Sequence, residues 1–174
     1  PYICAIDNVI YSKDKTKLQC YPQGRKGSFE NPDFVTTIGR QAFSSCYNLT
    51  SVNISNSVTF IENLAFYDCK SLSQIIIGCN VDKIGLFGTF YTPSIKTIYS
   101  MSKFPPLIIK YQREDERPNT FYDETYKFAK LYVPAGRGAK YEEAEGWKNF
   151  RKIDEMDAGV EETVGEDMSV RVIN

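Results

Sequence analysis

Residues 35–57 read VTTIGRQAFSSCYNLTSVNISNS, residues 58–80 read VTFIENLAFYDCKSLSQIIIGCN, and these two stretches decide the fold. A shift of 23 residues places the chain on itself with apolar residues in the same columns. The columns are Val35/Val58/Val81, Ile38/Ile61/Ile84, Leu49/Leu72/Ile95, Val52/Ile75/Ile98, Ala42/Ala65, Phe43/Phe66 and Cys46/Cys69. A repeat of this length predicts a solenoid, in which each coil buries its apolar face against its neighbours.

Each unit contains two local patterns. The segment Leu49–Ile54 ends in alternating apolar and polar residues, which predicts a short strand with one buried face. The segment Ile38–Leu49 spaces its apolar residues by three and four, which suits one or two helical turns. Gly39 and Gly85 fall between the two patterns, where a close backbone approach favours glycine. We therefore expect an α/β fold, a right-handed solenoid with a parallel sheet of short strands and short helical turns.

Different patterns at the two ends of the chain predict caps. The hairpin expected near the N-terminus has strands at Val9–Ser12 and Leu18–Tyr21 around the polar turn Lys13–Lys17. We expect a solenoid over residues 1–156 followed by a different segment. The solenoid has three parts: residues 1–34 (hairpin and a degenerate repeat), 35–101 (three 23-residue repeats) and 102–156 (C-terminal capping unit). Residues 157–174 are expected to be an acidic linker or the start of a further segment.

The C-terminal capping unit has its own expected elements. Leu131–Pro134 reads as the last strand, and Ala139–Ala144 reads as a short helix. Trp147, Phe150 and Ile153 follow at a spacing of three residues, which suits one buried face.

The composition excludes several classes of function. The chain has no histidine, so Ser-His-Asp and Cys-His pairs are impossible and the commonest metal ligand is missing. Its 21 basic and 22 acidic residues give no electrostatic footprint for nucleic acid. No apolar run reaches the roughly 20 residues of a membrane helix. We predict no catalytic residue, no cofactor, no metal site, no nucleic-acid partner and no membrane insertion by this segment.

Two glycine-rich stretches superficially suggest phosphate loops. Gly24–Gly27 and Gly136–Gly138 both lack the spacing that aims several backbone donors at one phosphate, so turns are expected.

Five cysteines form no CxxC pair. We interpret Cys46 and Cys69 as small buried residues that stack in successive coils, the alternative being a redox or metal pair. Cys4 and Cys20 lie in the N-terminal element and could pair in an exported protein.

The third unit departs from the pattern of the first two. It has Thr92 where a cysteine would fall, and Phe87 or Phe90 is expected to occupy its aromatic position.

These motifs resemble the BspA-like leucine-rich repeats of bacterial surface proteins, which are common in Bacteroidetes. The resemblance covers about residues 5–156. It is carried by Val35–Leu49, its copy Val58–Leu72, the hairpin from Val9 to Pro22, Leu131–Pro134, Tyr141 and Gly146–Ile153. It implies an extracellular or cell-surface protein without enzymatic activity, which binds host or extracellular-matrix proteins. The N-terminus itself shows no signal sequence, so residues alone leave a cytosolic protein and a processed exported one open.

The strand pattern also predicts a binding face. If Val52, Ile75 and Ile98 point inward, their neighbours on each strand point outward. The outward residues that we take as the candidate partner-binding face are Ser51, Asn53, Gln74, Ile76, Thr97 and Tyr99, with Ser28 and Glu30 one unit earlier. Ile76 and Tyr99 are expected to add an exposed apolar edge.

The leading hypothesis is a non-catalytic, monomeric binding or adhesion module that recognises a protein partner through this face. A structural spacer that presents another domain, or a module that binds carbohydrate without catalysis, is the alternative.

Overall fold

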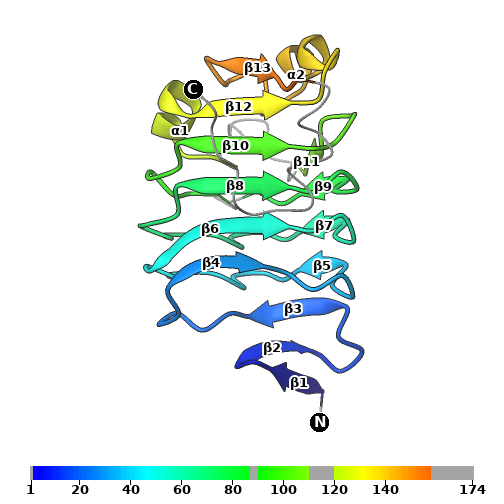
Figure 1. Ribbon diagram of the computed structural model, residues 1–174, viewed down its shortest axis with the longest axis vertical. Coiled ribbons are helices and arrows are strands. Elements are labelled where there is room, and N and C mark those ends of the chain that lie inside the picture. Colours follow the sequence, from blue (N-terminus) through cyan, green and yellow to red (C-terminus); the bar gives the residue numbers. More distant parts are fainter. Residues whose placement is uncertain (1, 87–89, 110–119, 158–174) are drawn as a thin grey trace.

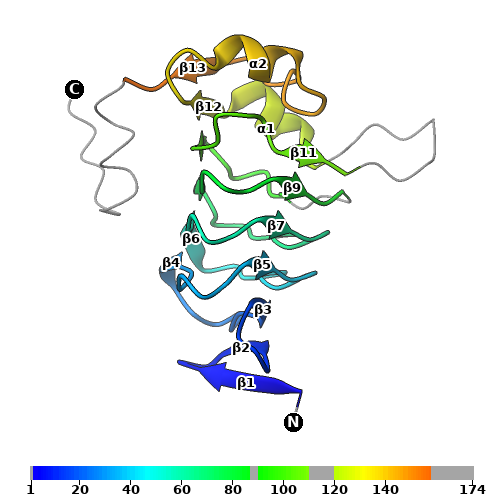
Figure 2. The same ribbon diagram turned by 90° about the vertical axis from the view of Figure 1, so that its right-hand side faces the viewer.

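The computed structural model describes residues 2–86, 90–109 and 120–157 as a stack of coils that rises from a hairpin to a helical cap (Figure 1). Two sheets run along the stack and form different faces of it (Figure 2). The six-stranded sheet is parallel and contains β4 (Gly27–Glu30), β6 (Leu49–Ile54), β8 (Gln74–Ile77), β10 (Thr97–Ser100), β12 (Lys130–Val133) and β13 (Ile153–Glu155). The seven-stranded sheet contains β1 (Ile3–Ile6), β2 (Val9–Ser12), β3 (Lys17–Cys20), β5 (Thr37–Ile38), β7 (Phe60–Ile61), β9 (Lys83–Ile84) and β11 (Leu107–Ile108).

The 23-residue period appears directly as strand register. Val52 of β6 pairs with Ile75 of β8, which pairs with Ile98 of β10. Ile38 pairs with Ile61 in the same way on the other sheet. Each of these side chains is at most 2% exposed, so every coil contributes its apolar columns to one continuous core. The predicted parallel solenoid is confirmed.

The segment after each short strand is not helical, in contrast to the expectation for Ile38–Leu49. The backbone N–H groups of Ala42 and Ser44 donate within their own turns, to Gly39 and Gln41. The N–H of Phe43, between them, donates instead to Ala65 O of the next coil at 2.8 Å. A helix would direct all of these groups within one segment. Apolar spacing by three and four also fits successive tight turns, and hydrogen bonding between coils selects them.

These turns require left-handed backbone at repeated positions. Gln41 and Leu64 have φ of 59° and 60° and lie one period apart. Ser45 and Asp68 form a second such pair at 60° and 57°. Non-glycine residues rarely adopt this conformation, so the contacts between stacked coils must offset its energetic cost.

Gly39 provides the predicted close approach between coils. A Cβ atom on Gly39 would lie 2.6 Å from Leu18 O of the preceding strand. The backbones of neighbouring coils therefore touch at this position.

An aromatic stack forms the centre of the core. The rings of Phe43 and Phe66 stack at 4.7 Å, Phe66 and Phe90 at 5.3 Å, and Phe90 and Phe121 at 5.1 Å. Phe90 therefore occupies the aromatic position of the irregular third coil, whereas Phe87 lies outside the described residues. The stack continues into the C-terminal cap because Phe121 also contacts Trp147 at 5.5 Å.

The cysteine column lies beside this stack and serves packing, as interpreted from the sequence. Cys69 Sγ donates to Phe43 O at 3.0 Å, and Thr92 Oγ1 makes the equivalent bond to Phe66 O at 2.7 Å. Thr92 is a polar replacement that keeps the same inter-coil hydrogen bond. All five cysteines are free, so the suggested pairing of Cys4 with Cys20 is not found.

The two buried thiols are expected to resist alkylation. Burial raises the pKa of Cys46 and of Cys69 to about 12, so neither forms the reactive thiolate near neutral pH. Iodoacetamide at pH 8 should label the exposed Cys20 and Cys79 in the native protein and leave Cys46 and Cys69 unmodified. Peptide mass spectrometry reads the result, and labelling in guanidinium, where all five thiols should react, is the control. Labelling of Cys69 as fast as Cys79 would contradict the packing role.

The N-terminal cap is a three-stranded antiparallel element. β2 and β3 form the expected hairpin, and β1 adds a further strand outside it. The side chain of Lys17 in β3 forms a salt bridge with Glu62 at 2.7 Å, which ties the hairpin to a coil two units away.

The C-terminal cap differs from expectation at its last strand. β12 forms as predicted, but β13 (Ile153–Glu155) follows it and pairs with it in parallel, so Leu131–Pro134 is not the last strand. Ile153 belongs to this strand and not to a helical face, because the parallel pairing of β13 with β12 places it opposite Leu131. The helices are α1 (Asp123–Phe128) and α2 (Gly138–Glu143), and Trp147 closes the core behind them. Of the expected acidic linker at 157–174, the residues after Asp157 lie outside the described residues.

Glu155 locks the loop that precedes α2. Its carboxylate accepts hydrogen bonds from Gly136 N–H at 2.8 Å and Gly138 N–H at 2.7 Å. These amides are therefore occupied by the chain's own anion, and Gly136–Gly138 is a structural turn, as expected.

The contribution of Glu155 to stability should depend on pH. The hydrogen bonds from Gly136 and Gly138 lower the pKa of Glu155 below its ordinary value. A carboxyl group with a lowered folded-state pKa stabilises the fold above its unfolded pKa of about 4.3 and loses that effect as the pH falls through the folded value. Glu155→Gln should therefore be less stable than the parent at pH 7, and the difference should shrink below about pH 4. Urea denaturation at several pH values measures it, and a difference that is independent of pH would contradict the role of the charge.

Candidate functional site

The predicted binding face forms two rows across the six-stranded sheet. In the first row, the register places Asn53, Ile76 and Tyr99 side by side on β6, β8 and β10. The second row, two residues earlier on each strand, consists of the half-buried side chains of Ser51, Gln74 and Thr97. The structure therefore brings all six predicted residues together on one face.

The predicted exposure of Ile76 is wrong. Its side chain is only 4% exposed, and Asn53 beside it is 7% exposed. Ile76 nevertheless lies outside the core cluster of the described residues, as an outward-pointing side chain should. It occupies a central strand and lies between Asn53 and the larger side chain of Tyr99 in its row. Strand alternation gave the correct face but not the extent of burial.

The first row continues into the cap, which the sequence analysis missed. Tyr132 of β12 is the register partner of Tyr99, and their rings stack at 5.0 Å. Asp154 of β13 is the next partner in the row. Burial raises the pKa of Tyr99, so its hydroxyl group stays a neutral hydrogen-bonding group at physiological pH. The predicted strand at Leu131–Pro134, placed one step beyond β10, was the signal that could have added Tyr132.

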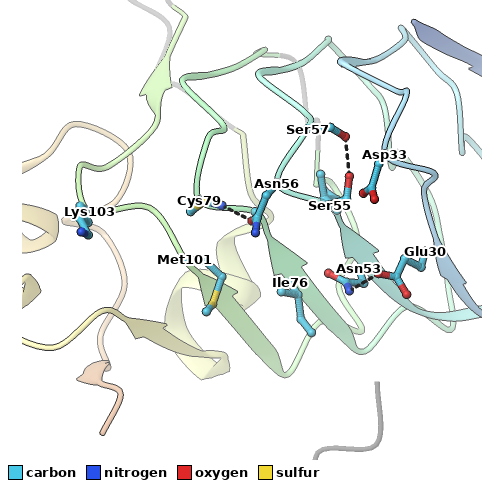
Figure 3. Close-up of a pocket in the computed structure, with 12 residues that line it drawn as sticks. Glu30, Asp33, Asn53, Ser55, Asn56, Ser57, Ile76, Cys79, Met101 and Lys103 are labelled. Atoms are coloured by element: carbon cyan, nitrogen blue, oxygen red, sulfur yellow. Dashed lines mark hydrogen bonds between the residues drawn. The ribbon is translucent and has the colours of Figure 1, made fainter. Parts of the chain in front are cut away.

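A groove of about 630 Å³ lies where the strands of this sheet end (Figure 3). It begins beside the first row, since both Asn53 and Ile76 line it. The other lining residues come from four successive coils and are Glu30, Asp33, Ile54, Ser55, Asn56, Ser57, Gly78, Cys79, Met101 and Lys103. The groove and the two rows form one continuous surface, which we call the outer face.

Hydrogen bonds fix the inner wall of the groove. Asn31 Nδ2 donates to Ser55 Oγ at 2.8 Å, and Ser55 N–H donates back to Asn31 Oδ1 at 2.9 Å. Ser55 Oγ contacts Ser57 Oγ at 2.7 Å, and Ser57 Oγ donates to Val35 O. Because these side chains hold one another across two coils, the wall is preorganised.

Gly78, which lines the groove, allows two neighbouring coils to pack closely. A Cβ atom there would lie 2.5 Å from Ser55 O and 2.7 Å from Ile54 O, so the coil that contains β8 packs its backbone directly on the coil that contains β6. Next to it, Cys79 N–H donates to Asn56 Oδ1 at 2.9 Å, which adds a further hydrogen bond between coils to the wall of the groove.

Opposite charges lie at the two ends of the groove (Figure 3). Glu30 and Asp33 come from the first coil of the six-stranded sheet, and Lys103 comes from the segment after β10. Glu30 Oε1 accepts a hydrogen bond from Asn53 Nδ2 at 3.0 Å. Among the described residues, neither Asp33 nor Lys103 has an ion-pair or hydrogen-bond partner. Sequence reasoning missed the groove because most of its lining residues follow the strands, where alternation no longer assigns a direction.

The described residues contain no group of three or more acidic or cysteine side chains that could hold a metal ion. None of the helices described here is long and apolar enough to cross a membrane. What the outer face offers chemically is hydrogen bonding, charge and aromatic contact.

Comparisons with known proteins agree with this architecture. Residues 17–107 match a family model, the BspA type leucine rich repeat region, in six copies. A crystal structure of a leucine-rich repeat protein from Eubacterium ventriosum has 28% sequence identity and a TM-score of 0.62, covering 76% of this chain and 33% of that chain. A leucine rich cell surface protein from Faecalibacterium prausnitzii shares 22% identity and the fold, with a TM-score of 0.60 over 93% of this chain and 41% of its own.

This chain therefore spans well under half of both solved structures. A search of curated proteins finds no match. The family model covers more than half of the chain, and the matched segment contains coils that stack in register. The chain belongs to the BspA-type leucine-rich repeat family.

Proposed function

We propose that this chain is a non-catalytic binding module of a secreted or cell-surface protein and that it recognises a protein partner through its outer face. The continuous row from Asn53 through Ile76 and Tyr99 to Tyr132 carries the proposal. It presents the half-buried, stacked rings of Tyr99 and Tyr132 on a rigid sheet, with the nearly buried Asn53 and Ile76 as their neighbours in the row. Such a surface pays little conformational entropy on binding.

The partner class follows from the mixed character of this surface. Tyrosine supplies contact area at low entropic cost, and the small polar residues Ser51, Gln74 and Thr97 supply adaptable hydrogen bonds. The extracellular setting is supported by the family and by the description of the Faecalibacterium prausnitzii structure as a cell surface protein.

Binding to a panel of immobilised extracellular-matrix proteins, namely fibronectin, fibrinogen, laminin and collagen, tests the proposal. For any protein that binds, Gln74→Arg and Thr97→Arg should each weaken the affinity at least tenfold, which is about 1.4 kcal/mol. Both side chains are half-buried on the outer face, so a longer side chain would block a docked partner.

Ser71→Arg is the matched control, because Ser71 is an exposed turn residue before β8 and lies outside the outer face. It should leave the affinity unchanged. If both outer-face variants bind as tightly as the control, the partner docks elsewhere and the assigned surface is wrong.

A further inference from the structure

We infer that the groove at the carboxyl end of the six-stranded sheet holds an extended polypeptide segment with a basic residue at one end and an acidic residue at the other. This inference rests on the proposed function and names the chemistry that its partner should carry. It is drawn from the charges, the length and the wall of the groove.

The charges set the two ends of the occupant. Asp33 is exposed and unpaired among the described residues, next to Glu30, so this end attracts a cation. Lys103 is likewise exposed and unpaired at the other end and attracts an anion. Opposite charges placed across an interface provide orientation and specificity. An uncharged occupant would leave both ends unused.

The length of the groove sets the size of the occupant. Its lining residues come from four successive coils, and neighbouring strands lie about 4.8 Å apart, so three steps give roughly 14 Å. An extended chain advances about 3.3 Å per residue, so this distance corresponds to about four residues. A short strand-like segment with charges at its first and fifth positions, about four steps apart, matches both ends.

The wall of the groove favours a polypeptide over a saccharide. The lining residues include Asn, Ser and the aliphatic or thioether side chains of Ile76 and Met101, but no aromatic ring on which a sugar could stack. Asn53 uses its Nδ2 on Glu30, which leaves its Oδ1 to accept a hydrogen bond, and Asn56 uses its Oδ1 on Cys79, which leaves its Nδ2 to donate one. A peptide backbone offers both partners.

The test titrates four short peptides into the isotope-labelled full chain and follows backbone amide signals by NMR. The probes are Ac-RSSSE-NH2, its reverse Ac-ESSSR-NH2, the neutral Ac-QSSSQ-NH2 and the dibasic Ac-RSSSR-NH2. At least one mixed-charge peptide should shift the signals of residues 53–57 with an affinity tenfold or more above that of the neutral peptide. The effect should weaken at 1 M salt, because exposed charges are then screened.

Lys103→Glu should change which peptide is preferred. With acidic groups at both ends, the groove should bind Ac-RSSSR-NH2 at least tenfold better than the mixed-charge peptides. Lys96→Glu introduces the same charge change at an exposed position outside the groove and should not alter the preference.

Three outcomes would overturn the inference: equal binding of the neutral peptide, identical behaviour of Lys103→Glu and Lys96→Glu, or shifts produced by maltotriose and by none of the peptides. These outcomes are distinct from failure of the proposed function. If Gln74→Arg still abolishes binding to a matrix protein while the peptides have no effect, only the groove inference fails. If the peptides bind but no outer-face variant affects a matrix protein, only the proposed docking surface fails.

Discussion

Replacement of Phe66 by alanine is expected to lower the free energy of unfolding by about 3–5 kcal/mol. Phe66 is fully buried and stacks between Phe43 at 4.7 Å and Phe90 at 5.3 Å. Each coil is stabilised mainly by its neighbours, so a cavity in a middle coil weakens two interfaces at once. Chemical denaturation followed by circular dichroism measures the loss.

Tyr67→Ala is the matched control for this prediction. Tyr67 is the next residue along the chain but is 40% exposed, and its ring stacks only at the surface, on Tyr91. Replacement of Tyr67 should lower the free energy of unfolding much less than replacement of Phe66. Equal losses from the two variants would mean that the aromatic stack does not form the centre of the core.

Gly78→Ala should destabilise the protein by about 1–3 kcal/mol, although only one methyl group is added. The new Cβ atom would lie within 2.7 Å of three backbone atoms of the coil below, Ile54 O, Ser55 C and Ser55 O. Backbone atoms cannot rotate away as a flexible side chain can, so the coils that contain β6 and β8 would have to separate. The same denaturation experiment measures the effect.

Gly24→Ala provides the comparison, because no atom lies within 4 Å of a Cβ at that position. It should change stability by less than about 0.5 kcal/mol. A Gly78→Ala protein as stable as Gly24→Ala would show that the coils are not in close backbone contact at Gly78.

The sequence predicted the parts of the fold that every coil repeats. Val52, Ile75 and Ile98 could be placed in one row because strands in neighbouring coils must align at the period of the repeat. The consecutive tight turns that replace the expected helical turns were not predictable from the same pattern. Apolar spacing by three and four does not distinguish a helix from consecutive turns, and the bond from Phe43 N–H to Ala65 O belongs to two coils that are distant in sequence.

Less of the candidate site than of the fold could be predicted from the sequence. Alternation along β8 indicated that Ile76 points away from the core, but its burial depends on neighbours that alternation does not describe. The groove could not be foreseen, because the directions of Asp33, Asn56 and Lys103 are set by the turns that follow the strands. Those turns are shaped by contacts such as that of Gly78 with Ser55, which no local pattern encodes.

The register of the coils fixes the distance between the two charged ends of the groove. Duplication of one 23-residue unit in its middle would insert one further strand between Asp33 and Lys103 and move the two charges about 4.8 Å further apart. The chemistry at both ends would stay the same, while the preferred spacing between a partner's charged residues would grow by one to two positions. Gain or loss of whole repeats would thus change the charge spacing that the groove accepts in a partner, without any new type of contact.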